Sequence, residues 1–151
     1  MNRPRFAKTP FLVVALSMAL LPGLRAARAD ENAKGKEAEV KIPATYMEAV
    51  GAIEARSKAI AKLIETKKLD GIHVEAAAIK KIADAMPKLV AKEGSGVPKD
   101  AYKEVLQASK ALSGMFPKLD EAGDSGNLAE SQKLHAMVLD HVAVLKKHTK
   151  H

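Results

Sequence analysis

The sequence predicts an all-α protein: an up-down-up-down antiparallel four-helix bundle that follows a cleaved signal peptide. Three observations lead to this prediction. The chain of 151 residues opens with a basic and then apolar segment, and Gly and Pro divide the remainder into four segments of helix length. Apolar side chains recur in these segments at alternating steps of three and four residues, and no segment alternates with a period of two. Since short loops make successive helices antiparallel, we expect a bundle without a sheet.

The segment 1–29 has the parts of a Sec signal peptide. Basic residues come first, followed by an apolar run over residues 11–21, which is much shorter than the ~20 residues of a bilayer span. Ala27 and Ala29 are the small residues that a signal peptidase requires before its cleavage point. We therefore expect a mature protein that begins near Asp30, is periplasmic and exported in soluble form, and is not stably inserted in a membrane.

The charge of the mature protein argues against nucleic acid as a partner. Five of the 25 Lys and Arg residues, but none of the 18 Asp and Glu residues, lie in residues 1–29, so the formal charge falls from +7 to about +2 without them. The remaining lysines alternate with Glu and Asp. The chain has no cysteine, so its stability in an oxidising compartment must come from packing and not from disulfides.

Residues 30–43 are charged and nearly free of large apolar groups, which predicts a flexible leader. The bundle is expected over residues 44–148, with a frayed basic tail at 149–151. Its four predicted helices are 44–68, 70–93, 98–122 and 127–148.

Each predicted helix has an apolar stripe that should face the core. In order, the stripes are Tyr46, Val50, Ile53, Ser57, Ile60 and Ile64; Ile72, Ile79, Ile82, Met86 and Leu89; Tyr102, Val105, Ser109, Leu112, Phe116 and Leu119; and Leu128, Leu134, Val138, Val142 and Leu145. Asp70 and Asn127 are predicted N-caps, and Pro98 suits an opening position because its missing N–H costs nothing there. Pro87 and Pro117 stand late in their helices, so each helix is expected to kink or restart near the preceding residue.

The four helices, the chain length and the exported location resemble the cytochrome b562 and cytochrome c-prime group over about residues 44–148. The c-prime type has a Cys-x-x-Cys-His haem attachment near the end of its last helix. This chain has Lys147 and His148 at that point and ends in His151, without any cysteine. Covalent haem is therefore excluded.

The resemblance to the b562 type implies non-covalent haem between a methionine near the start of the first helix and a histidine near the end of the fourth. Met47, His141 and His148 are the matching residues, and antiparallel packing would bring those helix ends together. Methionine and histidine are ordinary axial ligands of haem. The alternative is that Met47 only fills space in the core.

A second candidate site is a transition-metal site of the copper type on the last helix. Met137, His141 and His148 share one helix face, and His151 could reach it from the tail. Thioether and imidazole are suitable ligands for Cu(I). The alternative is a solvated basic turn that complements the helix dipole, because several lysines surround these histidines.

Catalytic motifs are absent from the sequence, which predicts that the protein is not an enzyme. Its carboxylates, for example Glu54, fall mostly between apolar positions, where we expect them to be solvated. Lysines four residues away should pair with two of them, in Glu54–Lys58 and Asp84–Lys88. We expect His73 and His135 to be buried and satisfied by the backbone or by Ser131.

Two functional classes remain. One is a cofactor-free interaction or stress-accessory bundle that uses an exposed helix face. The other is a periplasmic carrier of a transition metal or of b-type haem. A protein partner or a homodimer is also compatible with the sequence, since small side chains let helices approach closely; the alanines considered for this contact are Ala49, Ala52, Ala59, Ala76, Ala77 and Ala78.

Overall fold

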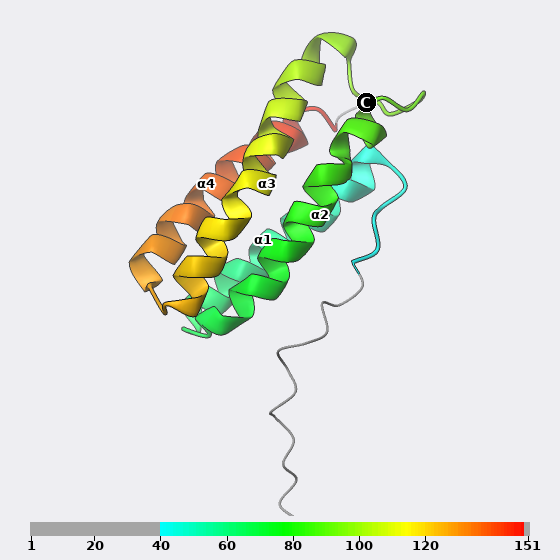
Figure 1. Cartoon of the computed structure of the whole chain (residues 1–151). Coiled ribbons are helices and arrows are strands. Elements are labelled where there is room, and N and C mark those ends of the chain that lie inside the picture. Colours follow the sequence, from blue (N-terminus) through cyan, green and yellow to red (C-terminus); the bar gives the residue numbers. More distant parts are fainter. Residues whose placement is uncertain (1–39, 150–151) are drawn as a thin grey trace, which may run out of the picture. The chain divides into compact units, whose positions relative to one another are not determined.

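The computed structural model describes residues 40–149, and this part of the chain is all-α, as predicted. Its helices are α1 (Tyr46–Glu65), α2 (Ile72–Val90), α3 (Tyr102–Asp124) and α4 (Leu128–Lys147), and they lie side by side (Figure 1). Two 3-10 turns, Leu69–Gly71 and Lys99–Ala101, lead into α2 and α3. The predicted signal peptide and residues 30–39 of the predicted leader lie outside the described residues.

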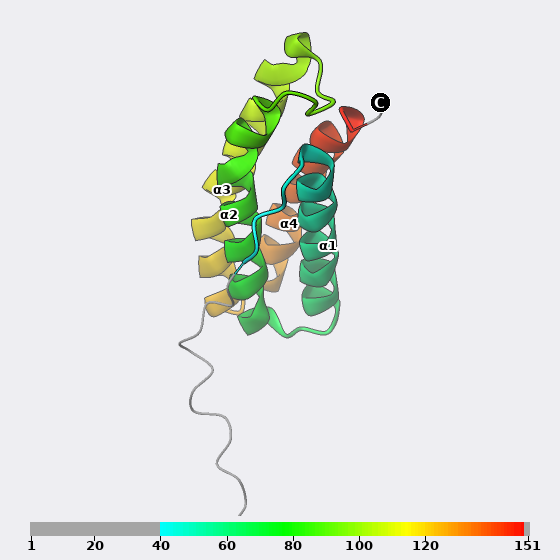
Figure 2. The ribbon, with the colours of Figure 1, turned by 90° about the vertical axis from the view of Figure 1, so that its right-hand side faces the viewer.

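The helices pack in a closed ring of neighbours. α1 contacts α2 and α4, and α3 contacts α2 and α4. Figure 2, turned by a right angle from Figure 1, shows α1 and α4 on one side of the bundle and α2 and α3 on the other. The apolar stripes predicted from the sequence face the space between the helices, with Tyr102, Phe116 and Leu128 only partly buried at its edges.

Polar contacts join the beginning of one helix to the end of a neighbour. Tyr46 in the first turn of α1 contacts Leu145 in the last turn of α4, and His73 at the start of α2 contacts Asp120 near the end of α3. At the other end of α3, Glu104 accepts a hydrogen bond from His148, the C-cap residue of α4. These contacts fix which helix ends lie next to each other.

Side-chain caps begin α1 and α4. Thr45 and Glu48 form a reciprocal capping box at α1, and the Asn127 side chain accepts a hydrogen bond from the Glu130 N–H at α4. The prediction of Asn127 as a cap is confirmed. The prediction for Asp70 is wrong, because the 3-10 turn Leu69–Gly71 takes up that residue and α2 begins after Gly71 without a side-chain cap.

Neither proline restarts its helix. Pro87 lies inside α2, which runs on to Val90, and Pro117 lies inside α3, which runs on to Asp124. A proline removes one backbone hydrogen bond, but buried residues precede and follow each proline in the sequence, and their packing holds the helix together. These residues are Met86 and Leu89 around Pro87, and Met115 and Leu119 around Pro117.

α1 and α3 end in the same way, although different residues make the turn. After α1, Lys67 has a φ of 56° and the Lys68 N–H bonds to the Leu63 carbonyl at 2.9 Å. After α3, Gly126 has a φ of 65° and the Asn127 N–H bonds to the Ala122 carbonyl at 2.9 Å. Both are left-handed helix endings, in which glycine is the favoured residue. Lys67 therefore occupies a position whose backbone favours glycine.

The ends of the described chain are attached to the bundle. Val40 packs against the core, and residues 40–45 pass beside α2 in both views (Figures 1 and 2). Thr149, predicted to belong to a frayed tail, bonds to the Lys146 carbonyl through both its N–H and its hydroxyl group. Within residues 40–149, no helix combines the length and the hydropathy of a bilayer span.

Candidate functional site

Met47 and His148, the two ends of the predicted haem site, do not face a shared interior space. Met47 is 62% exposed on α1. The His148 side chain is only 12% exposed, and its Nε2 lies 2.9 Å from Glu104 Oε2. An axial pair needs both ligands beside one buried haem plane, so this arrangement would have to open before Met47 and His148 could hold haem.

Met137 and His141 lie one turn apart on the flank of α4 that also carries His148. Met137 is 43% exposed and His141 is partly buried. His151 lies outside the described residues. Among residues 40–149, no group of three or more His, Cys, Asp or Glu side chains comes together in a way that could hold a metal ion.

The other two histidines tie neighbouring helices together, and Ser131 serves neither. His135 Nε2 on α4 donates to the Ser57 carbonyl of α1 at 2.9 Å, and His73 Nδ1 on α2 bonds to Asp120 of α3. Both rings are partly buried. The expectation of a backbone partner is confirmed for His135 and wrong for His73, which bonds to a carboxylate. Ser131 satisfies neither histidine, because its buried hydroxyl has no hydrogen-bond partner in the described structure.

An ion pair between Lys146 and Glu54 joins α4 to α1. Glu54 pairs with Lys58, as predicted, and also with Lys146 of α4, each at 3.0 Å. Hydrogen bonds from Lys146 and then Lys58 hold the pKa of Glu54 below its ordinary value, which corrects the expectation that this carboxylate is merely solvated.

Two further carboxylates have lowered pKa values. Hydrogen bonds from Lys80 and Ser113 lower the pKa of Asp84, so this residue pairs with Lys80 and not with the predicted Lys88. The hydrogen bond from His148, followed by that from Lys147, lowers the pKa of Glu104. The bond from Ser113 joins α3 to Asp84 of α2, and the bonds from His148 and Lys147 join the end of α4 to Glu104 of α3.

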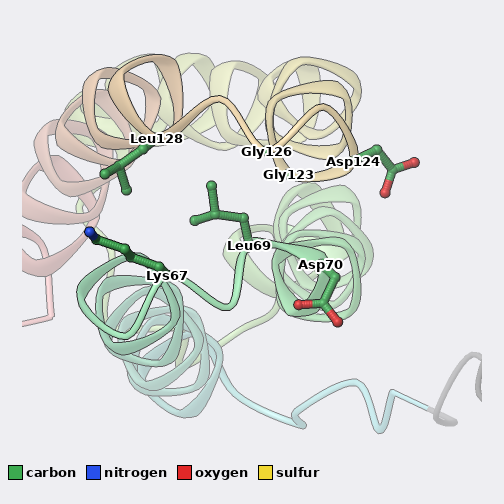
Figure 3. Close-up of a pocket in the computed structure, with 7 residues that line it drawn as sticks. All are labelled: Lys67, Leu69, Asp70, Gly123, Asp124, Gly126 and Leu128. Carbon is green, nitrogen blue, oxygen red and sulfur yellow. The ribbon is translucent and has the colours of Figure 1, made fainter. Parts of the chain in front are cut away.

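A shallow hollow of about 340 Å³ lies where the α1–α2 and α3–α4 connections meet (Figure 3). Leu69 stands in its middle, with Lys67 and Leu128 on the α1/α4 side. Asp70 and Asp124 are on the α2/α3 side, and the Asp124 carboxylate points away from Lys67. Gly123 allows the close approach of the two connections, because an added Cβ would meet the Leu69 carbonyl oxygen at 2.8 Å.

The central part of the outward face of α4 has few polar residues. Between Lys133 and Lys146, five residues of this helix are exposed, and only one of them is polar: Ala136, Met137, Leu139, Asp140 and Ala143. Leu139 is 46% exposed and Met137 is 43% exposed. We will call these five residues the α4 face. Met137 and Leu139 are two residues apart in the helix, so they lie on opposite flanks of this face, with Ala136, Asp140 and Ala143 between them.

The alanines considered for a homodimer are not on such a surface. Ala49, Ala76, Ala77 and Ala78 are buried inside the bundle, and Ala52 and Ala59 are partly buried. They let the helices of one chain approach closely and leave little area for a second chain. The sequence contained the evidence for the α4 face, since its residues fall between the members of the stripe formed by Leu134, Val138, Val142 and Leu145.

A scan against protein-family models and searches of curated proteins and of solved structures find no match to this chain.

Proposed function

We propose that this protein is exported to the periplasm and acts there as a cofactor-free, non-enzymatic interaction or stress-accessory protein. The features of residues 1–29 support export, with cleavage before Asp30. Contacts between successive helix ends support an up-down-up-down bundle. The likeness to the cytochrome b562 and c-prime group extends to this architecture only.

The observation that carries the proposal is the α4 face. An exposed helix surface with four apolar residues out of five costs solvation free energy unless a partner covers it. Between Lys103 and Lys118, the exposed residues of α3 are Leu106, Gln107, Lys110, Gly114 and Pro117, which include one large apolar side chain. The α4 face has two large apolar side chains and one polar residue, so it is the more apolar of the two surfaces.

The first experiment tests export and the absence of a cofactor. The full-length chain, without a histidine tag, is expressed in a bacterial host and purified from the periplasm. Its N-terminus is then sequenced, its metal content and absorption spectrum are measured, and it is titrated with haem and with Cu(I). We expect Asp30 as the first residue and a colourless, metal-free protein that does not respond to either titration.

A stoichiometric ligand would overturn the cofactor-free proposal in favour of a carrier. Loss of that ligand in Met47→Ala would assign it to the haem site of Met47, His141 and His148. Loss in Met137→Ala would assign it to the copper-type site of Met137, His141, His148 and His151. Retention of the chain in the cytoplasm would overturn the periplasmic part.

A second experiment tests the interaction role in the cell. A photo-crosslinking amino acid is placed at Ala143 in the α4 face or, as a control, at Gln107, which is exposed on α3. We expect a discrete crosslinked product from position 143 and none from position 107. Equal products from both positions, or none from either, would contradict a specific interface on α4.

A further inference from the structure

Three charged residues form a row along the middle of the outward side of α4. Lys133, Asp140 and Lys147 are seven residues apart, and residues with this spacing lie within about 20° of one line along an α-helix. All three are exposed. The row carries the charges plus, minus and plus, and the apolar residues of the α4 face surround its centre.

We propose that the α4 face binds the α4 face of a second copy of this chain, in an antiparallel arrangement about a two-fold axis. This inference rests on the proposed interaction role and names the partner. In a two-fold contact, residue i of one copy meets residue j of the other while j meets i. Antiparallel α4 helices can thus place Asp140 against Lys133 of the second copy twice in one interface.

The register follows from this charge pairing. With Asp140 opposite Lys133, the two-fold axis passes between Ala136 and Met137, and nearly the whole of α4 overlaps with its counterpart. In a parallel pair, Asp140 of one chain would instead face Asp140 of the other chain. Like charges in direct opposition weaken association.

The existing partners of these residues favour the same register. Asp140 has no ion pair or hydrogen bond within the described part of the chain, so its carboxylate is available. Lys133 has only an exposed contact of 3.4 Å with Glu130 in the same helix, a kind of pair that contributes little. Lys147 is already engaged with Glu104 of α3, and pairing it with Asp140 would restrict the overlap to the last two turns of α4.

The other residues suit a contact between helices. Ala136 and Ala143 have small side chains that let two helices approach, and Met137 is flexible enough to fill the remaining space. One helix face buries less than the roughly 800 Å² per partner of a standard interface. We therefore expect a reversible dimer whose population depends on concentration.

Sedimentation equilibrium on the processed full-length product tests the proposal over about 10 µM to about 1 mM, the range of weak interfaces. We expect a monomer–dimer equilibrium, at least ~10-fold weaker in Asp140→Lys because both reciprocal pairs become repulsive. Lys133→Asp should weaken it similarly. The double variant Lys133→Asp/Asp140→Lys should recover most of the association, because it restores both pairs with their signs exchanged.

Asp100→Lys is the matched control. It makes the same charge change at an exposed residue of the turn before α3, and it should leave the dimer unchanged. A wild-type protein that is monomeric throughout would overturn the dimer, as would a double variant that associates no better than the single ones. If position 143 then crosslinks to a different protein, the interaction role holds and only the choice of partner is wrong.

Discussion

The Tyr46 hydroxyl donates a hydrogen bond of 2.8 Å to the backbone carbonyl of Leu145, although the two residues are 99 positions apart. Tyr46 is buried, and this burial raises the pKa of its hydroxyl to about 12, so it stays protonated and able to donate across the neutral range. The bond closes the bundle by fastening the first turn of α1 to the last turn of α4.

Removing this hydroxyl should destabilise the protein modestly. In Tyr46→Phe we expect the free energy of unfolding to fall by about 1 kcal/mol, as for a typical buried hydrogen bond. The loss stays near this value because the Leu145 carbonyl also accepts from the His148 N–H at 3.2 Å. Urea unfolding followed by circular dichroism measures the change. Tyr102→Phe serves as the control, since Tyr102 is only partly buried and its hydroxyl makes no hydrogen bond in the described structure; an equal loss there would contradict the account.

Two glycines of α3 should respond to alanine with opposite signs. Gly123→Ala places a Cβ 2.8 Å from the Leu69 carbonyl oxygen and 3.3 Å from Ile72 Cβ, so the α1–α2 connection has to move. We expect a loss of about 1–3 kcal/mol in the free energy of unfolding. Gly114 has open space around it, and Gly114→Ala should stabilise the helix by about 0.5–1 kcal/mol. Thermal unfolding of both variants checks the pair, and stabilisation by Gly123→Ala would show that the close approach at Leu69 is not tight.

Lys67→Gly should stabilise the protein even though it removes a side chain. Lys67 has a φ of 56°, and a left-handed backbone strains every residue with a Cβ but not glycine. We expect a gain of about 0.5–1 kcal/mol in the free energy of unfolding, partly offset by the greater freedom of glycine in the unfolded chain. Lys68→Gly is the control, because the φ of Lys68 is −95° and glycine there brings only the entropic cost. A loss of stability in Lys67→Gly similar to that in Lys68→Gly would rule out the strain.

The helix-linking carboxylates should make stability fall in acid. Hydrogen bonds from His148 and Lys147 hold the folded-state pKa of Glu104 below its ordinary value. Its contribution is therefore fully present above the unfolded-state pKa and is lost as the pH falls through the lower folded-state value. Glu104→Gln should lower Tm near pH 6 and lower it less near pH 3, where more of the Glu104 carboxylate is protonated in the folded state. A difference in Tm that is the same at both pH values would show that the ionised form of Glu104 is not responsible.

The fold was predictable because local periodicity determines it. Apolar residues at steps of three and four predicted that each of the four segments is a helix, and Asn127, a favourable N-cap residue, predicted the start of α4. The start of α2 was misplaced because a 3-10 turn over Leu69–Gly71 competes with helix at Asp70, and the sequence contains no strong signal to separate them.

The contacts between helices could not be predicted, since they depend on how side chains meet across the bundle. His135 bonds to Ser57, which is 78 positions away, and Glu54 pairs with Lys146 as well as with its local partner Lys58. Only local pairs follow from spacing. Even there, Asp84 has a lysine four residues away on either side; it pairs with Lys80 and not with Lys88, and Ser113 of α3 bonds to its other carboxylate oxygen.

The fastening of Tyr46 to Leu145 also bears on the order in which the bundle can be completed. α2 covers part of the apolar stripes of α1 and α3, and α4 covers the rest, so these stripes are not fully covered until the last helix has been synthesised. The first and last turns of the bundle therefore meet only after α4 has been made, and a protein that loses its C-terminal turn should lose both the Leu145 carbonyl that accepts from Tyr46 and the buried Leu145 side chain beside it.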